Sequence, residues 1–333
     1  MDRIAKLLRD EPEYRPRRMC LHPSAPNGCD KVVSAHSVQR AKSLEAIAEE
    51  GHVLGFPKAM APLVKKGLVA PEPFGIRVAS TFPGFCKSHD DETFAAVEKV
   101  PFQHTREQVG LIHFRGMCYE WYAKLVNLGR AKLTADQAGE QDEATDVAMS
   151  WLAGAAVDAK FIKDHKEVFG AMVLNSNWSR LRFACAEIEP NIPLVASGVN
   201  SPFYSVDCKQ LQDGAQPEWR LRNNCFSIIH EGNRAFIVIS WLDEDSDVID
   251  QLWSAIERVP PNQIVDCLVR YAFVNVENVF MRPSWWAGLT EQQQRAVMRM
   301  VNQMFAFTTE PWSCAPHAKS LVKTRFVQWV ARP

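Results

Sequence analysis

The chain has 333 residues, of which 47% are hydrophobic and 23% are charged, and this is the composition of a globular protein long enough for two cores. The formal net charge of −1 excludes nucleic-acid binding through a bulk positive field and leaves only local basic patches for such contacts. No apolar run approaches the length of a membrane span, and residues 1–6 lead into a charged segment rather than a secretory signal, so we expect a cytoplasmic protein without membrane contact.

Residues 1–18 predict a short amphipathic helix followed by a basic segment. Arg15, Arg17 and Arg18 come directly before the first cysteine, Cys20. Such a cluster can hold the phosphates of a nucleic acid, and it can equally be a solvated lead-in to the next element. Both interpretations stay open at this point.

A loop rich in turn residues separates Cys20 from Cys29. Pro23, Pro26 and the pair Asn27-Gly28 all favour turns, so the loop can fold its two thiols together. The chain has nine cysteines, an odd number, and no secretory signal is apparent. Reduced thiols are therefore expected, with metal binding as the better interpretation for paired cysteines.

A second pair of metal-binding residues, Cys86 and His89, follows later in the chain. Their spacing places both side chains on one face where a helix begins. Together with Cys20 and Cys29 they make a set of four soft or borderline ligands in two pairs, as tetrahedral zinc requires. We predict that these four residues bind Zn²⁺, with His22 able to replace one of them. A further Cys-x2-His, Cys314 to His317, has no partner pair nearby.

Between the two ligand pairs, the sequence predicts a strand, a histidine, a helix and then a long loop. Residues 31–35 are expected to form a short strand that ends at His36, and Ser37 is expected to cap a helix that reaches Gly51 and exposes Arg40 near His36. Residues 52–79 contain many prolines and glycines and predict a loop-rich insertion. His52 is a further candidate ligand or base, although a lone histidine is more often structural.

This order of a cysteine loop, a strand ending in histidine, a short helix and a Cys-x2-His at a second helix resembles the treble-clef, HNH-type zinc module of bacterial and phage nucleases. The resemblance covers about a quarter of the chain. It implies that Cys20, Cys29, Cys86 and His89 hold a structural zinc ion and that His36 is the general base. Asp90 falls where many members have a ligand of the catalytic metal, Mg²⁺ or Mn²⁺ here. Ala35, by contrast, stands where many members have a further ligand, and the family's mid-motif asparagine would fall near Ser80 or Thr81.

The remainder of the chain predicts helices and an antiparallel sheet. Thr105 begins a helix that is expected to end near Leu128, and a second long helix is expected to follow the acidic linker 134–143. Residues 178–243 alternate as strands do and predict an antiparallel sheet, and helices and a last strand follow it. The predicted fold is α+β, with a zinc module in 1–100, a helical connector in 101–176 and a C-terminal domain of unknown role in 177–333.

The sequence supports two main functional hypotheses. The first is a zinc-stabilised HNH-like nuclease that hydrolyses nucleic acid, DNA in preference to RNA, with His36 as base and Asp90 at a catalytic metal, in phage defence or a mobile element. Arg15, Arg17, Arg18 and Arg40 would contact the nucleic acid. The alternative is a non-catalytic zinc module that forms an interaction surface for nucleic acid, a protein partner or a second copy, while the C-terminal domain senses or regulates. A third possibility is catalysis by Asp207, His230 or Glu277, which only their ability to ionise supports.

Overall fold

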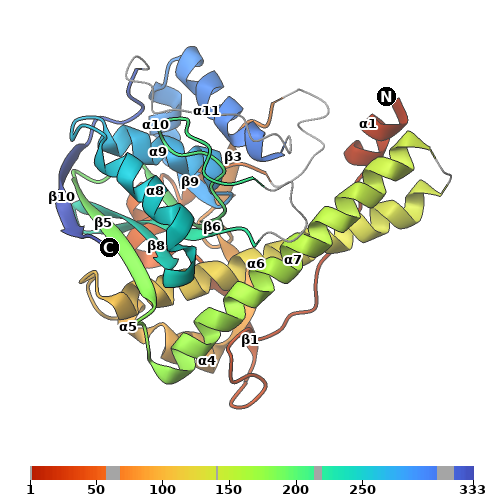
Figure 1. Cartoon of the computed structure of the whole chain (residues 1–333), viewed down its shortest axis with the longest axis horizontal. Helices are drawn as coiled ribbons and strands as arrows, with labels where there is room; N and C mark the ends of the chain where they lie inside the picture. The colour runs from red at the N-terminus through yellow and green to blue at the C-terminus, as the bar shows by residue number, and fades with distance from the viewer. Residues whose placement is uncertain (1, 58–67, 140–141, 214–219, 306–318) are drawn as a thin grey trace.

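The computed structural model describes residues 2–57, 68–139, 142–213, 220–305 and 319–333. Helices and an antiparallel sheet together confirm a mixed α and β fold. The main sheet has eight strands in the order β10-β5-β8-β7-β6-β9-β2-β3, and a separate two-stranded sheet joins β1 to β4 (Figure 1).

The helices are α1 (Asp2–Arg9), the π-helix η1 (Arg40–Leu44), α2 (Glu45–Ile47), α4 (Lys87–Thr93), α5 (Ala95–Glu98), α6 (Arg106–Ala138), α7 (Glu143–Asn175), the 3-10 helix η2 (Asp243–Asp245), α8 (Ser246–Glu257), α9 (Ile264–Asn275), α10 (Pro283–Gly288) and α11 (Glu291–Phe305). The strands are β1 (Val32–His36), β2 (His52–Gly55), β3 (Glu72–Gly75), β4 (Thr81–Cys86), β5 (Leu181–Glu189), β6 (Leu194–Asn200), β7 (Asn224–Glu231), β8 (Arg234–Leu242), β9 (Val279–Met281) and β10 (Arg325–Ala331).

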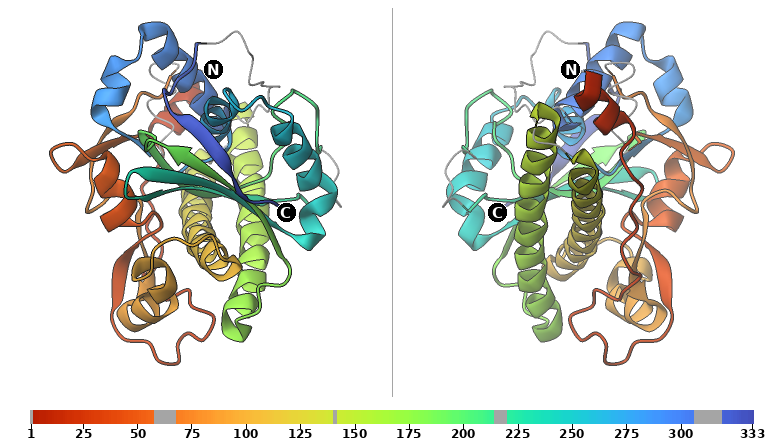
Figure 2. Two further views of the ribbon diagram at one scale, coloured as in Figure 1. Left: turned by 90° about the vertical axis from the view of Figure 1, so that its left-hand side faces the viewer. Right: turned by 90° about the vertical axis from the view of Figure 1, so that its right-hand side faces the viewer.

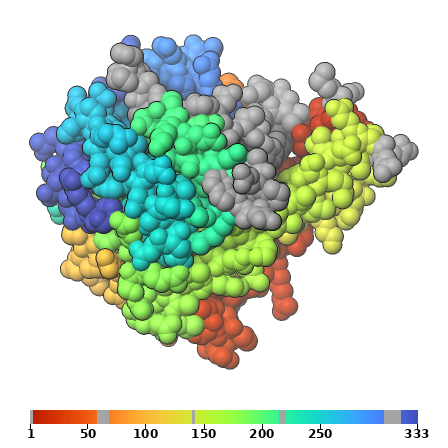
Figure 3. Space-filling view, viewed as in Figure 1, coloured from red at the N-terminus to blue at the C-terminus, as the bar shows by residue number. Residues whose placement is uncertain are grey.

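A long helical hairpin, α6 and α7, lies along one side of the sheet. Thr105 caps α6 as predicted, because its side chain accepts a hydrogen bond from the backbone N–H of Gln108. Each helix has 33 residues, so the expected end of α6 near Leu128 is wrong and the helix continues to Ala138. The far part of the hairpin projects from the body of the molecule with α1 beside it (Figures 1 and 3).

The central strands of the sheet are buried on both faces. Alternate side chains of β5, β7 and β8 pack toward α6 and α7, among them Cys185, Cys225 and Val238, whereas their neighbours pack toward α8 and α9. The two helical layers enclose the sheet between them (Figure 2). Because both faces are covered, these strands consist of nearly continuous buried runs and not of the alternation expected from the sequence of 178–243.

The N-terminal module packs directly against this body. Phe85 of β4 and Phe94 belong to the same buried cluster as Phe114 of α6. The segment predicted to be a loop-rich insertion also contains the short strands β2 and β3, which join the edge of the main sheet through β9, while its other described residues are turns and irregular chain. The three-domain division stays a prediction, although the main sheet combines strands of its first and third parts.

Several local expectations also need correction. The helix expected from Ser37 to Gly51 is a π-helical turn followed by a three-residue helix. Residues 220–222, which lie within the segment 178–243 expected to form the sheet, are not part of a strand. Seven of the described cysteines are free, but Cys267 is disulfide-bonded, so the expectation of reduced thiols fails at that position. The pair Cys314 and His317 lies outside the described residues.

Candidate metal centre

The loop between Cys20 and Cys29 is held against the end of β4 by backbone hydrogen bonds. The N–H of Leu21 donates to the carbonyl of Gly84 at 2.8 Å, next to the strand's last residues. Gly28 has a φ of +70°, a left-handed conformation that glycine adopts without strain, and it turns the loop back toward His89. The loop therefore brings its two thiols to the place where β4 meets α4.

The other two ligands lie on either side of that junction. Cys86 ends β4 and is the N-cap residue of α4, and His89 is in the first turn of the helix. Asp30, directly after the loop, accepts a hydrogen bond from the backbone N–H of Ser88 at 3.1 Å. This bond satisfies a free N–H at the start of α4 and ties the loop to the helix.

Three sulfur atoms converge on one ring nitrogen. The distances from Nδ1 of His89 are 3.3 Å to Sγ of Cys86, 3.5 Å to Sγ of Cys20 and 3.6 Å to Sγ of Cys29. All four ligand atoms lie within 4.8 Å of one another. One ring nitrogen has a single lone pair or a single proton, so it cannot form three hydrogen bonds at once. The convergence is that of a group that could hold one shared metal ion.

The donor set and its dimensions fit zinc. A tetrahedral ion with Zn–S bonds of about 2.3 Å and a Zn–N bond of about 2.0 Å separates sulfur from nitrogen by roughly 3.5 Å. The three observed distances lie around this value. Partial burial raises the pKa of the Cys20 thiol, and a bound cation would favour the thiolate instead. Cys20, Cys29, Cys86 and His89 could therefore bind a metal such as zinc, as the sequence predicted.

His22 lies beside this group but is not part of it. Its ring stacks on that of His89, with centroids 4.0 Å apart, and its Nδ1 accepts a hydrogen bond from the N–H of Ser24. Burial, together with His89 and Lys166, lowers the pKa of His22 to about 4. The ring is therefore neutral near pH 7 and stacks on His89, and it lies outside the group of four converging ligand atoms.

His36 ends β1, as the sequence predicted, and is held in one orientation. Its Nε2 lies 3.1 Å from the carbonyl oxygen of Ile76. A carbonyl only accepts, so Nε2 carries the proton and the neutral ring keeps its lone pair on Nδ1. Burial lowers the pKa of His36, against the opposing effect of the Ile76 carbonyl. The ring is therefore neutral near pH 7 and able to accept a proton at Nδ1.

Asp90, the predicted ligand of a catalytic metal, is engaged by Arg115 of α6. The two side chains form an ion pair at 3.4 Å, Arg115 also pairs with Glu98, and its guanidinium lies 3.8 Å from the centre of the Phe94 ring. Burial raises the pKa of Asp90, although Arg115 opposes that effect. Within the described residues, the Cys₃His group is the one cluster of three or more metal-ligating side chains, so the neighbours of Asp90 give no support to a Mg²⁺ or Mn²⁺ site and that site stays a prediction.

Sequence reasoning missed Arg115. It lies in the middle of a helix that was assigned no chemistry, among residues with helical periodicity. An arginine within an apolar helical stretch was the available signal, because a charged group buried there needs a charged partner.

The predicted nucleic-acid contacts are exposed. Arg15, Arg17, Arg18 and Arg40 all lie at the surface. Arg15 is near Glu13, Arg40 is near Glu45, and Arg18 donates to the backbone carbonyl of Val32. Arg40 is also one of the charges that influence the pKa of His36, so it lies on the same side of the module. Their role in binding stays a prediction.

In the C-terminal part of the chain, the polar residues form structural contacts. Asp207 pairs with Arg258, Glu277 pairs with Lys124, and the ring of buried His230 lies against the carbonyl of Leu194. These three candidate residues thus have separate partners.

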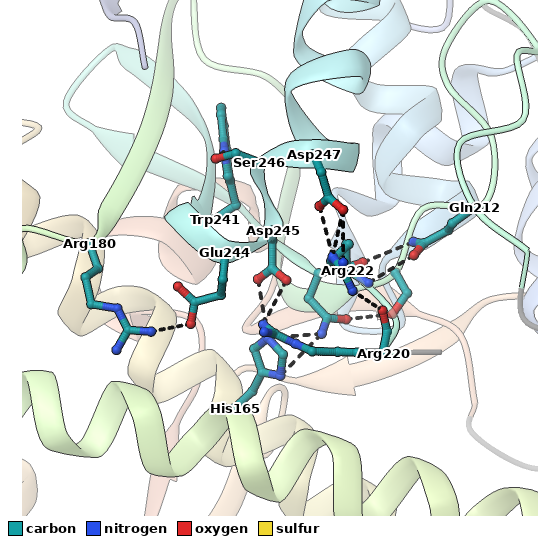
Figure 4. A network of polar contacts seen from close by, with 12 residues as sticks. His165, Arg180, Gln212, Arg220, Arg222, Trp241, Glu244, Asp245, Ser246 and Asp247 are labelled. Atoms are coloured by element: carbon teal, nitrogen blue, oxygen red, sulfur yellow. Dashed lines mark hydrogen bonds and ion pairs between the residues drawn. The ribbon is translucent and has the colours of Figure 1, made fainter. Parts of the chain in front are cut away.

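A larger polar network joins α7 to the start of α8 (Figure 4). His165 lies 3.4 Å from Asp245, which also binds Arg220, while Asn223 lies beside the same ring. His165 and Asp245 are both buried, and the network extends through Arg222 to Asp247. Its contacts explain how the loop before β7 is fixed against α7.

Comparisons with protein-family models, curated protein sequences and solved structures found no significant match to this chain. Among the described residues, no helix is both long and apolar enough to cross a membrane. The functional argument therefore depends on the geometry of the side chains.

Proposed function

We propose that the Cys₃His group binds a structural zinc ion. The single observation that carries this proposal is the convergence of three thiols on Nδ1 of His89 at distances that match a tetrahedral zinc site. A zinc ion there would join the irregular cysteine loop to the junction of β4 and α4. The ion would have a structural role, since four protein ligands leave no coordination position for a substrate or water.

We further propose that this module presents His36 as the general base of an HNH-like nuclease. Support comes from the position of His36 at the end of β1, whose strand partner β4 carries Cys86 into the ligand group. The Ile76 carbonyl fixes the proton on Nε2, and Nδ1 would accept a proton from a water molecule that attacks phosphorus. The P–O bond to the leaving nucleotide would then break, and the leaving oxygen would take a proton from solvent. Exposed Arg40 would contact phosphate. No step is assigned to Asp90, because its carboxylate is paired with Arg115.

One observation favours the alternative hypothesis of a non-catalytic module. Arg115 pairs with both Asp90 and Glu98, so these acidic side chains are engaged in ion pairs within the fold. A module whose acidic groups serve as internal ion pairs would act as a scaffold for an interaction surface. The basic residues before Cys20 would then bind nucleic acid or a protein without cleavage.

Metal analysis and a cleavage assay distinguish the two hypotheses. Purified protein is tested for zinc content and for cleavage of plasmid DNA and RNA with added Mg²⁺ or Mn²⁺. The variants are His36→Ala, Cys86→Ser and, as a matched control, His52→Ala, which changes an exposed histidine. The nuclease hypothesis requires stoichiometric zinc in wild type and His36→Ala, with cleavage lost in His36→Ala and retained in His52→Ala. Stoichiometric zinc without cleavage by the wild type on either substrate would support the scaffold.

A further inference from the structure

A small cavity lies where the N-terminal module meets the main sheet. Its walls come from the segment after His36, from α5, from α6 and from strands β6 and β7. The cavity has a volume of about 30 Å³. One water molecule takes about 30 Å³ in the liquid and needs less than half of that in a tight cavity, so this volume admits one or two water-sized guests.

Three polar side chains in the cavity wall have unsatisfied atoms. Arg115, Ser197 and Ser227 are only 5%, 3% and 1% exposed. The Nε of Arg115 and the hydroxyl oxygens of both serines have no hydrogen-bond partner among the described residues. They come from three different elements, α6, β6 and β7, and line one cavity. Buried polar groups without partners cost free energy, so three of them around one cavity point to bound molecules that form hydrogen bonds with them.

We propose that this cavity is a built binding site for ordered water. One or two water molecules accept from Nε of Arg115 and exchange hydrogen bonds with the hydroxyls of Ser197 and Ser227. Cavities that remain dry in proteins are lined by apolar groups, and three polar atoms make this one different.

Electrostatics favours an uncharged guest over an anion. The guanidinium of Arg115 already has two carboxylate partners, Asp90 and Glu98. Glu231 also lines the cavity, where its carboxylate pairs with Lys42. The local charge is therefore already negative or balanced, and a buried anion would be repelled.

The bound water has a structural consequence. Arg115 uses its two terminal nitrogens to hold Asp90 and Glu98, and Nε is the donor left for the cavity. Water on Nε completes the hydrogen bonding of this side chain and links it to β6 and β7. The metal-binding module and the main sheet are thus joined by a hydrated polar contact as well as by apolar packing.

The direct test is a high-resolution crystal structure of the full chain, with a second crystal soaked in bromide. We expect solvent density within hydrogen-bond distance of Nε of Arg115 and at least one serine hydroxyl, and no anomalous bromide signal there. Bromide at this position would overturn the proposal in favour of an anion site. A cavity without density would overturn it in favour of a dry one.

The sign of a stability change provides an independent test. If water occupies the cavity, Ser197→Ala and Ser227→Ala remove a partner of that water, so each lowers Tm. In a dry cavity the same substitutions remove an unsatisfied hydroxyl, and a raised Tm would contradict the proposal. The matched control is Thr134→Val, because the Thr134 hydroxyl is buried and unsatisfied but does not line this cavity, so its Tm is expected to rise. Zinc content should be unchanged in all three variants.

Discussion

Nδ1 of His89 lies 3.3 Å from Sγ of Cys86, the residue that caps the same helix three positions earlier. The same nitrogen also faces the thiols of Cys20 and Cys29. One side chain thus connects a turn-rich loop with the junction of β4 and α4. Because His36 lies on the strand paired with β4, a metal at this point would also limit the movement of that histidine.

Cys86→Ser should abolish metal binding and destabilise the fold. Serine oxygen is a poor zinc ligand, and loss of a structural metal removes binding free energy that contributes to folding. We expect zinc content to fall below stoichiometric and Tm to fall by at least roughly 5 °C. The control is Cys208→Ser, since Cys208 is free, exposed and outside the ligand group. Equal zinc content in the two variants would contradict this assignment.

The pH dependence of cleavage should report His36. Burial lowers the pKa of His36 below its usual value of about 6.5, so the neutral base persists to lower pH than for an exposed histidine. In a plot of kcat/KM against pH, activity is therefore expected to fall on the acid side with a midpoint below about pH 6.5. His36→Ala should remove the activity while zinc content and Tm are retained. A midpoint above that value would argue against His36 as the base.

Arg115→Met should destabilise the chain by about 3 kcal/mol, because it leaves the carboxylates of Asp90 and Glu98 without their buried cationic partner. Chemical denaturation measures the change. Arg106→Met, at the exposed start of the same helix, is the control and should change stability by no more than about 0.5 kcal/mol. If the two variants had equal stability, the ion cluster would have no structural role.

Local sequence patterns predicted the metal group well because each feature depends on near neighbours. Turn residues between Cys20 and Cys29 fold that loop, and the spacing of Cys86 and His89 places both at the start of one helix. The antiparallel sheet in 178–243 was predicted for the same reason, and within it β7 and β8 are joined by the turn at Gly232.

Features that depend on distant contacts could not be predicted in this way. Strands β2 and β3 are short and contain proline and glycine, and only their pairing through β9 makes them part of the sheet. The partner of Asp90 was equally hidden, because Arg115 is separated from it by 25 residues and reaches it only after α6 packs on the module. No local pattern indicates such a pair.

Acid should destabilise the fold through two buried histidines. Burial lowers the pKa of His113 to about 3 and that of His230 to about 4, whereas both titrate near 6.5 when unfolded. Between about pH 6.5 and 4 the unfolded chain therefore binds more protons, and the free energy of unfolding decreases as pH falls, by at most about 1.4 kcal/mol per pH unit for each histidine.

Urea denaturation at about pH 7 and about pH 5 measures this loss of stability. His230→Gln is the informative variant, since an amide can still donate to the carbonyl of Leu194 but does not titrate. The variant should lose less stability than the wild type between the two pH values. The same loss in both proteins would exclude His230 as a source of the acid sensitivity.

Two glycines in the helical hairpin should respond to alanine in opposite directions. A Cβ at Gly110 of α6 would lie 2.1 Å from the ring of Trp178, which is buried, so Gly110→Ala forces the helix and the ring apart and should cost about 1–3 kcal/mol. A Cβ at Gly154 of α7 meets nothing within 4 Å, and the higher helix propensity of alanine should stabilise the chain by up to about 1 kcal/mol. Thermal unfolding of both variants measures the two effects. A stabilised Gly110→Ala variant would mean that α6 does not pack this closely on Trp178.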